Sequence, residues 1–332
     1  MVVVDTGSVD DSRAIAARHG ARVFEFPWTG DFAAARNHAI EQATSEWLLY
    51  IDADERVRPC DRAALQAELA APGLLAATVV FRPRTGFTAY PEMRLLRRDA
   101  RIRFHGAMHE TFLPDIERLT GEGAGTTGAS CLAIDHVGYD GDQSHKLERN
   151  RSLLLKQIAA DPGRAYLRWH LGCVYLALGL ESAAEAEWRA GIEIVRAQGR
   201  RLPDDALCFV ELVKLRWARE EEVSALLAEA QALQPDNWLL CWLRAKILAD
   251  AGQHDAAMVL FERLAAVDAA TLVHAIAYDS RIFGAWACAE AGHCAFQQGD
   301  FGVSADWYAR AEQMAPSVRE FQVKRMLASA RR

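Results

Sequence analysis

Two closely spaced carboxylates, Asp52 and Asp54, are the side chains of this chain best suited to chemistry. They follow the run Trp47–Ile51, which reads as a buried strand because it is short, apolar and bounded by polar residues. Open α/β sheets bind their ligands beyond the C-terminal ends of the strands. Carboxylate oxygens at such a place suit Mg²⁺ or Mn²⁺ that also holds a diphosphate. The pair is therefore a candidate metal site, and the plain alternative is a solvated turn.

The part of the chain around this pair alternates short apolar runs with amphipathic segments. Three runs read as strands, at residues 2–4, 23–26 and 47–51. Three segments read as helices, at about residues 10–18, 32–43 and 61–70. Asp31 is expected to cap the second of these helices. Such alternation predicts βαβ units around a parallel core.

Four further strands are expected without long helices between them, which makes the predicted sheet mixed. They are residues 78–82, 93–97, 102–104 and 131–134. Several arginines in this region are expected on the polar side of edge strands. These are Arg94, Arg97, Arg98, Arg101 and Arg103.

From about residue 146 onward the strand signals stop and helix follows helix. Small and aromatic residues recur there at the spacing of a helix–turn–helix unit of about 34 residues. The units are placed at about residues 165–198, 204–237, 238–271 and 285–318. Trp188, Phe261 and Tyr308 are expected to fill the core of these units rather than to bind a ligand. Four stacked units predict an all-α solenoid.

The bulk properties exclude several classes of protein. The 332 residues carry a net charge of −7, which does not favour binding to nucleic acid. Seven scattered cysteines without a Cys-X-X-Cys pair indicate reduced thiols rather than disulfides or a zinc site. There is neither a signal peptide nor an apolar run near 18 residues, so no membrane span is expected. These features favour a cytoplasmic location.

Five pieces of the first half together resemble a known family. They are, in order, Asp5-Thr6-Gly7-Ser8, Phe32-Ala33-Ala34-Ala35-Arg36-Asn37, Asp52-Ala53-Asp54-Glu55, His105-Gly106-Ala107-Met108-His109-Glu110 and Asp135-His136-Val137-Gly138. The set is similar to a family-2 glycosyltransferase of the GT-A fold with tetratricopeptide repeats behind it. The resemblance covers nearly the whole chain. It implies a catalytic domain at 1–145, a connecting helix at 146–164 and repeats at 165–320.

The resemblance implies a nucleotide-sugar donor, usually a UDP-sugar, and a divalent cation, Mg²⁺ or Mn²⁺. By motif, Asp5 would contact the base or ribose and Arg36 would help to hold the nucleotide. Asp52 and Asp54 would grip the diphosphate through the cation, and His136 matches the place of a further metal ligand. The structural alternative for Asp5 is that it caps a helix. The structural alternative for His136 is that it is a histidine of the core with its hydrogen bonds satisfied.

The same resemblance places His109 and Glu110 on the acceptor side of the site. Displacement of the diphosphate with inversion needs a group that deprotonates the acceptor hydroxyl. Glu110 is the better candidate base, with His109 as its orienter or alternate. The acceptor itself, whether a saccharide, a lipid-linked intermediate or a protein side chain, is left open.

Two other functions compete with a transferase. One is a non-catalytic scaffold whose repeats bind a protein partner and whose α/β domain is degraded, because solenoids present concave surfaces suited to peptides. The other is a nucleotidyltransferase, which would need a Gly-rich, basic triphosphate loop near the first strand.

One departure from the family concerns the first strand. Family members begin with a strand and an Asn-Glu turn before the run that corresponds to Val2–Val4, and here Met1 directly precedes that run. Residues 2–4 and 47–51 are apolar on both faces and read as interior strands. Because the downstream motifs are present, an N-terminally truncated sequence is favoured over a degraded relative of the family. Activity of the chain without the preceding strand is not expected from the family assignment alone.

Overall fold

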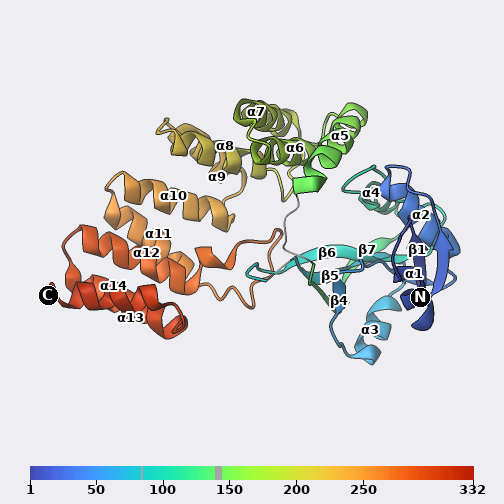
Figure 1. Ribbon diagram of the computed structural model, residues 1–332, viewed down its shortest axis with the longest axis horizontal. Helices are drawn as coiled ribbons and strands as arrows, with labels where there is room; N and C mark the ends of the chain where they lie inside the picture. The colour runs from blue at the N-terminus through green and yellow to red at the C-terminus, as the bar shows by residue number, and fades with distance from the viewer. Residues whose placement is uncertain (84, 139–143) are drawn as a thin grey trace. The chain divides into compact units, whose positions relative to one another are not determined.

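The computed structural model describes residues 1–83, 85–138 and 144–332, with the backbone alone at 144–146. Its contacts divide the chain into two compact units (Figure 1). The first unit comprises residues 1–81 and 91–180, and the second comprises residues 82–90 and 181–332. The domain boundaries expected from the sequence, 1–145, 146–164 and 165–320, stay a prediction.

The first unit carries the strands and the helices between them. The strands are β1 (Val2–Asp5), β2 (Arg22–Glu25), β3 (Trp47–Leu49), β4 (Glu55–Val57), β5 (Leu74–Arg82), β6 (Tyr90–Arg97) and β7 (Thr126–His136). The helices are α1 (Ser12–Arg18), α2 (Phe32–Gln42), α3 (Arg62–Leu69), α4 (Leu113–Gly121), α5 (Ser144–Ala160) and α6 (Ala165–Ala177). The alternation predicted for the first seventy residues is thus confirmed, with Asp31 capping α2 through the backbone N–H of Ala34.

The strands form two sheets. β1 and β2 make a parallel pair, and the second sheet has the order β3-β6-β5-β7-β4. Within it β3 runs antiparallel to β6, and β4 antiparallel to β7, so the architecture is mixed, as expected. One expectation is wrong: β6 is an interior strand rather than an edge. β1 and β3, read as strands that need a neighbour on each side, are half-buried, and each ends its sheet, so one edge of each is open.

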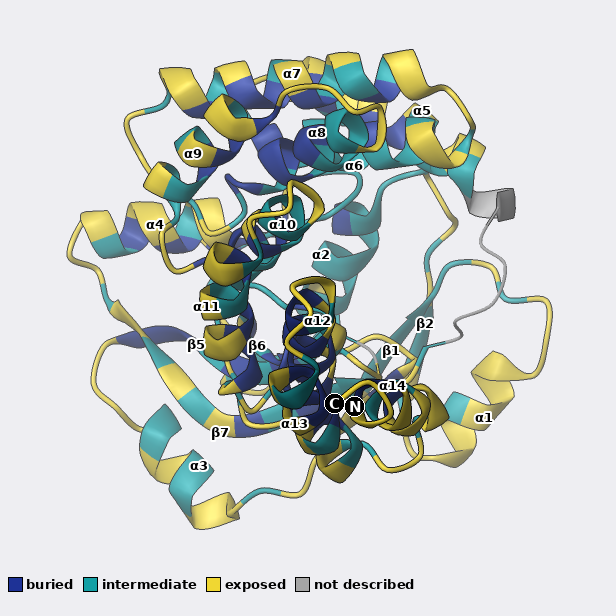
Figure 2. Cartoon of the chain, turned by 90° about the vertical axis from the view of Figure 1, so that its left-hand side faces the viewer, coloured by how far each residue is buried: buried dark blue, intermediate teal, exposed yellow. Residues whose placement is uncertain are grey.

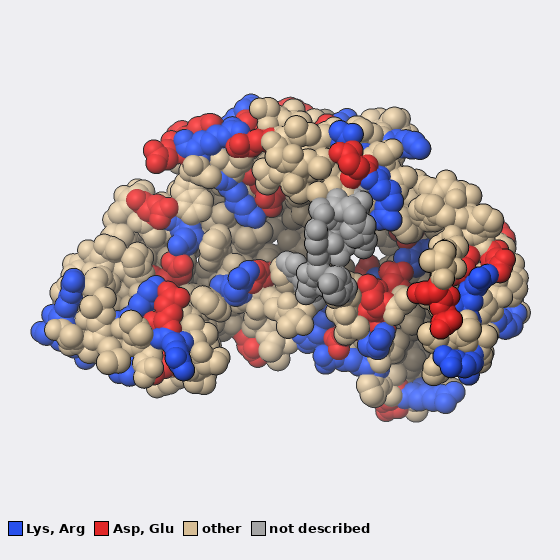
Figure 3. All heavy atoms as spheres, in the orientation of Figure 1, with Lys and Arg blue, Asp and Glu red and all other residues tan. Residues whose placement is uncertain are grey.

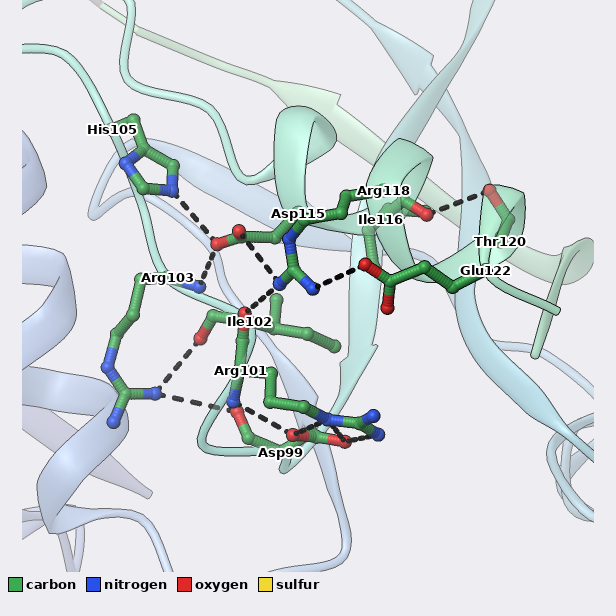
Figure 4. Close-up of polar contacts among 10 residues, drawn as sticks. All are labelled: Asp99, Arg101, Ile102, Arg103, His105, Asp115, Ile116, Arg118, Thr120 and Glu122. Carbon is green, nitrogen blue, oxygen red and sulfur yellow. Dashed lines mark hydrogen bonds and ion pairs between the residues drawn. The ribbon is translucent and has the colours of Figure 1, made fainter. Parts of the chain in front are cut away.

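Residues 102–104 form a loop instead of the expected strand, and the following helix α4 was not expected. Asp115 on α4 explains this loop: it accepts hydrogen bonds from the backbone N–H of Arg103 at 3.0 Å and pairs with Nε2 of His105 at 2.9 Å. Figure 4 shows these contacts together with the ion pair of Asp99 and Arg101. Both backbone groups of Phe104 pair with the side-chain amide of Asn37 on α2, at 2.8 and 2.9 Å. Because side chains of α2 and α4 bind these backbone groups, the loop does not need a strand partner.

The core of the first unit lies between the second sheet and the helices α2 and α4. Its buried residues come from α2, β5, β6, the 102–104 loop and α4, and they include Ala33, Ala76, Leu96, Phe104 and Leu119. A smaller apolar cluster joins Leu154 and Ile158 of α5 to Leu167 and Leu171 of α6. The two clusters together fix the ends of β3 and the loop that follows residue 104.

The second unit is built from helices. They are α7 (Glu181–Ala197), α8 (Leu207–Ala218), α9 (Ser224–Leu233), α10 (Trp238–Asp250), α11 (His254–Ala265), α12 (Gly284–Gln297), α13 (Phe301–Met314) and α14 (Arg319–Ser329), with a 3-10 turn, η1, at Ser280–Ile282. Each of the four predicted repeats therefore contains two consecutive helices, beginning with α6 and α7. None of the helices in the described part of the chain is long and apolar enough to span a membrane.

The residues singled out in the repeats are core residues, as expected. Trp188 and Phe261 are fully buried and Tyr308 nearly so. Gly292 of α12 has room for no larger side chain without a shift, because an added Cβ would lie 3.2 Å from the Tyr308 ring. Figure 2 shows α12 buried along most of its length, in contrast to the exposed α1.

A short segment between β5 and β6 is built into the second unit. Thr88 is fully buried: its backbone N–H donates to the Tyr278 carbonyl at 2.9 Å, and its hydroxyl accepts from the Tyr278 N–H at 2.9 Å. Ser280 donates to the Gly86 carbonyl at 2.7 Å, and Arg82 to the Ala270 carbonyl at 3.0 Å. The helical unit therefore contains a segment far from it in the sequence, which no repeat pattern indicates.

The packing of α11 predicts which of its side chains stabilise the protein. We expect Phe261→Ala to lower the free energy of unfolding by about 3–5 kcal/mol, because truncation of a buried Phe leaves a cavity. Val259 lies on the same helix with 66% of its surface exposed, so Val259→Ala is the matched control and is expected within about 0.5 kcal/mol of wild type. Urea denaturation followed by circular dichroism measures both. Equal effects of the two changes would mean that the buried face of α11 is misassigned.

Candidate active site

The turn after β3 holds Asp52 and Asp54 by means of the next residue, Glu55. The backbone N–H of Asp52 donates to the Glu55 carboxylate at 2.7 Å, and the N–H of Glu55 donates to the Asp52 carbonyl at 3.1 Å. This reciprocal pair closes the turn. Because Glu55 uses its buried carboxylate inside the turn, the side chains of Asp52 and Asp54 stay about half exposed.

Beneath the turn, Arg94 of β6 anchors Glu55. Its two terminal nitrogens lie 2.8 and 3.3 Å from the Glu55 oxygens, and its guanidinium lies between the rings of Tyr50 and Phe81. Glu92 adds a second carboxylate at 3.1 Å. Burial works against the charge of Arg94, but these carboxylates raise the pKa of its guanidinium above the ordinary value. Arg94 thus supports the acidic turn from below and is not the surface residue expected.

Asp54 and His136 face each other across the β4–β7 ladder. Asp54 Oδ2 lies 3.1 Å from His136 Nε2, and the N–H of Val137 donates to the Asp54 carbonyl at 2.8 Å. Gly138 leaves space for this pair: a Cβ there would come within 2.6 Å of His136 Nε2 and 2.7 Å of Asp54 Oδ2. Residues 82 positions apart in the sequence are therefore brought together, and their role as metal ligands stays a prediction.

Arg36 of α2 links two other candidate residues. Its Nη2 donates to Asp52 Oδ1 at 2.9 Å, and its Nε forms a close ion pair with Glu110 Oε1. The guanidinium also lies over the rings of Tyr50 and Phe104. Burial opposes its charge, but Asp52 and Glu110 raise the pKa of Arg36 above the ordinary value. Asp52, Arg36 and Glu110 therefore form one connected chain of charges.

His109 has a different environment from its neighbour Glu110. Its ring stacks on His170 of α6, with centroids 3.9 Å apart, and meets the edge of Tyr166. Burial lowers the pKa of His109 to about 4. Within the described part of the chain its Nε2 atom has no hydrogen-bond partner, and its backbone φ of 52° is in the left-handed region. The structure thus places His109 in an aromatic cluster, neutral at pH 7.

The loop that carries His109 and Glu110 is held by helix α5. Gln157 accepts a hydrogen bond from the N–H of Met108 at 3.0 Å. Its amide also lies against Gly106, where a Cβ would come within 2.7 Å of Gln157 Nε2, and the φ of 99° suits glycine alone. Gln157 carries no motif, so the sequence did not indicate it. Its contacts tie the candidate base to helices that follow the sheet.

Asp5 stands apart from this group. Its carboxylate accepts hydrogen bonds from the N–H groups of Gly7 and Ser8 at 3.2 Å, and Arg13 lies 3.9 Å away. Hydrogen bonding to Ser8 holds the pKa of Asp5 below its ordinary value, and Arg13 acts in the same direction. These contacts order the turn after β1. Asp5 does not cap α1, whose N-cap is Asp11, so the helix-cap alternative is wrong, and the nucleotide role of Asp5 stays a prediction.

The surface charge does not suggest another kind of ligand. On the face shown in Figure 3, basic and acidic side chains are interspersed rather than gathered into a basic stripe. This mixture agrees with the modest net charge of −7, and the expectation about nucleic acid stays a prediction.

Comparison with known proteins agrees with the geometry. Residues 1–153 match the family model described as glycosyl transferase family 2. A TPR repeat-containing protein of Synechococcus elongatus is 32% identical over 239 residues, covering 70% of this chain and 58% of that protein. The prophage-derived glycosyltransferase SunS of Bacillus subtilis is 30% identical over 177 residues, covering 49% of this chain and 39% of SunS.

Among solved structures, the tetratricopeptide-repeat protein YrrB is 16% identical, with a TM-score of 0.40, covering 54% of this chain and 82% of that one. The chain covers less than two thirds of the length of both the Synechococcus and the Bacillus relatives. Residues 1–153 form a glycosyl transferase family 2 domain, and helix pairs of the tetratricopeptide-repeat kind follow it.

Proposed function

We propose that this protein is a metal-dependent, inverting glycosyltransferase that moves a sugar from a nucleotide-sugar, a UDP-sugar, to an acceptor hydroxyl. The observation that carries the proposal is the meeting of Asp54 and His136, 3.1 Å apart, at the same turn where Asp52 joins Arg36 and Glu110. Two motifs distant in the sequence thus supply metal-ligating side chains next to a cation and a further carboxylate.

The residues at this turn fit a divalent cation that is shared with the substrate. A carboxylate oxygen and an imidazole nitrogen suit Mn²⁺, and the Asp54 and His136 side chains are 50% and 34% exposed. In the described ranges no three His, Cys, Asp or Glu side chains gather into a closed metal cage. Asp54 and His136, with Asp52 beside them, would hold the cation, and substrate phosphates would complete its coordination. When bound, the cation neutralises charge on the diphosphate leaving group.

The other residues act through charge and position. Arg36 presents a permanent positive charge beside Asp52, suited to holding the phosphates of the nucleotide. Glu110 receives the proton of the acceptor hydroxyl, so it exchanges its pairing with Arg36 for a hydrogen bond to the acceptor. His109, neutral and packed on His170, fixes the backbone next to Glu110. Attack by the acceptor opposite the departing diphosphate gives inversion.

The acceptor is a saccharide, a lipid-linked intermediate or a protein side chain. The helix pairs behind the catalytic domain favour a protein partner, because stacked repeats present extended surfaces to peptides. A scaffold with a degraded catalytic domain is the competing function. The Asp54–His136 and Arg36–Glu110 pairs support catalysis, since a scaffold has no need of them.

Release of UDP from UDP-sugars tests the proposal. We expect the protein with Mn²⁺ to release UDP from at least one UDP-sugar, slowly to water and faster with an acceptor. Glu110→Gln should slow release about 100-fold or more, the usual range for loss of a general base. Glu122→Gln, at an exposed carboxylate outside the site, is the matched control and should keep the wild-type rate. No release from any UDP-sugar, with or without acceptors, would favour the scaffold.

A further inference from the structure

Cys60 lies three residues beyond the end of β4, and Cys131 lies on β7, the strand that pairs with β4. The register pairs Glu55 with His136 and Val57 with Ile134. The backbone N–H of Arg58 donates to the Ala133 carbonyl at 2.8 Å, which continues the pairing beyond β4. Continued for three residues beyond Val57 and Ile134, this register would set Cys60 opposite Cys131.

The Cys131 side chain lies beside the segment that carries Cys60. Its Sγ lies 3.8 Å from the carbonyl oxygen of Asp61, the residue after Cys60, and Cys60 is among the groups that raise the pKa of the Cys131 thiol. Facing residues of an antiparallel pair have Cα atoms about 4.5–5.5 Å apart, within the range of about 4.4–6.8 Å that a disulfide spans. The backbone therefore needs little movement to accept a bond between them.

Exposure separates this pair from most of the other cysteines. Cys131 is exposed and Cys60 half-buried, and both are free thiols. Four cysteines of the helical unit are buried, namely Cys208, Cys241, Cys288 and Cys294. Cys173 on α6 is half-buried and lies far from the β4–β7 ladder in the sequence. A reagent in solution thus meets Cys60 and Cys131 on one face of the sheet domain.

We propose that Cys60 and Cys131 are a reversible redox site, closed to a disulfide by an oxidised small thiol such as oxidised glutathione. The thiolate of one cysteine attacks the glutathione disulfide and releases one glutathione thiol. The thiolate of the other attacks the resulting mixed disulfide and releases the second. Two protein thiols lose two electrons and two protons, and one glutathione disulfide becomes two thiols.

The surroundings of Cys131 set the order of these steps. Partial desolvation and the Glu68 carboxylate raise the pKa of the Cys131 thiol to about 11. Its backbone N–H donates to that same carboxylate at 2.9 Å, which keeps Glu68 in place. Because the thiolate is the nucleophile, Cys131 reacts slowly at pH 7, so exchange begins at Cys60. The rate of closure then rises with pH up to the pKa of Cys131.

The bond ties β4 to β7, the two strands that bring Asp54 and His136 together. A disulfide that closes a long loop stabilises chiefly by restricting the unfolded chain. We expect the oxidised protein to unfold roughly 5 °C higher than the reduced one. Dithiothreitol should reverse the shift. This inference stands apart from the proposed function, since it needs neither donor nor metal.

Mass spectrometry of the full-length protein tests it. The native protein is treated with oxidised glutathione, its remaining thiols are alkylated, and it is digested without reduction. We expect a cross-linked peptide pair containing Cys60 and Cys131, and the upward shift in unfolding temperature. Cys60→Ser and Cys131→Ser should each lose both signals, whereas Cys173→Ser, the matched control, should keep both. Separate glutathione adducts on Cys60 and Cys131, or a cross-link to another cysteine, would overturn the assignment.

Discussion

Replacement of Glu55 by glutamine is expected to destabilise the protein by about 3–5 kcal/mol, the usual cost of removing one partner of a buried ion pair. The side chains of Glu55 and Arg94 are 1% and 7% exposed, and glutamine would leave the guanidinium without its closest countercharge. The turn would also lose the carboxylate that binds the N–H of Asp52. Urea denaturation measures the loss in the free energy of unfolding.

An exposed ion pair of Arg97, which lies on β6 together with Arg94, provides a matched control. Arg97 pairs with Glu46, whose side chain is 71% exposed, and exposed pairs contribute at most about 1 kcal/mol. Glu46→Gln should therefore change stability little. The double variant Glu55→Gln, Arg94→Met should recover part of the loss, because it removes the buried charge as well. A Glu55→Gln protein as stable as Glu46→Gln would show that Arg94 is not buried against Glu55.

Replacement of Asp54 by alanine is expected to remove metal-dependent UDP binding while the protein stays folded. Loss of a hydrogen bond that orients a metal ligand commonly lowers the affinity for the metal 10–100-fold. Loss of the ligand itself should therefore lower the metal-dependent affinity for UDP about 100-fold or more. Thermal unfolding should change little, because Asp54 is half exposed and exposed ion pairs contribute little to stability.

Glu41→Ala is the control for this change, since Glu41 is an exposed carboxylate on the helix that carries Arg36. It should bind UDP and Mn²⁺ as the wild type does. If Asp54→Ala keeps the metal-dependent affinity of the wild type, the assignment of the turn after β3 as the metal site is wrong.

Local patterns predicted most of the elements that carry the site. The apolar run at 47–51 placed the acidic turn, Asp31 marked the start of α2, and the recurring Trp188, Phe261 and Tyr308 located the helix pairs. These features depend on residues close together in the chain, so a sequence displays them directly. The 102–104 run misled because its two apolar residues, Ile102 and Phe104, fill a core equally well from a loop held by Asp115.

Contacts between residues far apart in the chain could not be predicted from the sequence. Glu55 was read as one more acid of the turn, and Arg94 as a surface arginine, because nothing local says that residues 39 positions apart share a buried ion pair. The stacking of His109 on His170 depends on how α6 packs, and the position of Cys60 relative to Cys131 on the register of β4 and β7.

The central claim, that the turn at Asp52–Asp54 binds a nucleotide diphosphate through a metal, is tested most directly by calorimetric titration of UDP. The titration is run on the wild-type protein twice, with Mn²⁺ and with a chelator. We predict binding with Mn²⁺ and a loss of affinity of at least about tenfold with the chelator, because the carboxylates of Asp52 and Asp54 repel the diphosphate unless a cation lies between them. Equal affinity for UDP in the two titrations, or no binding in either, would contradict the account.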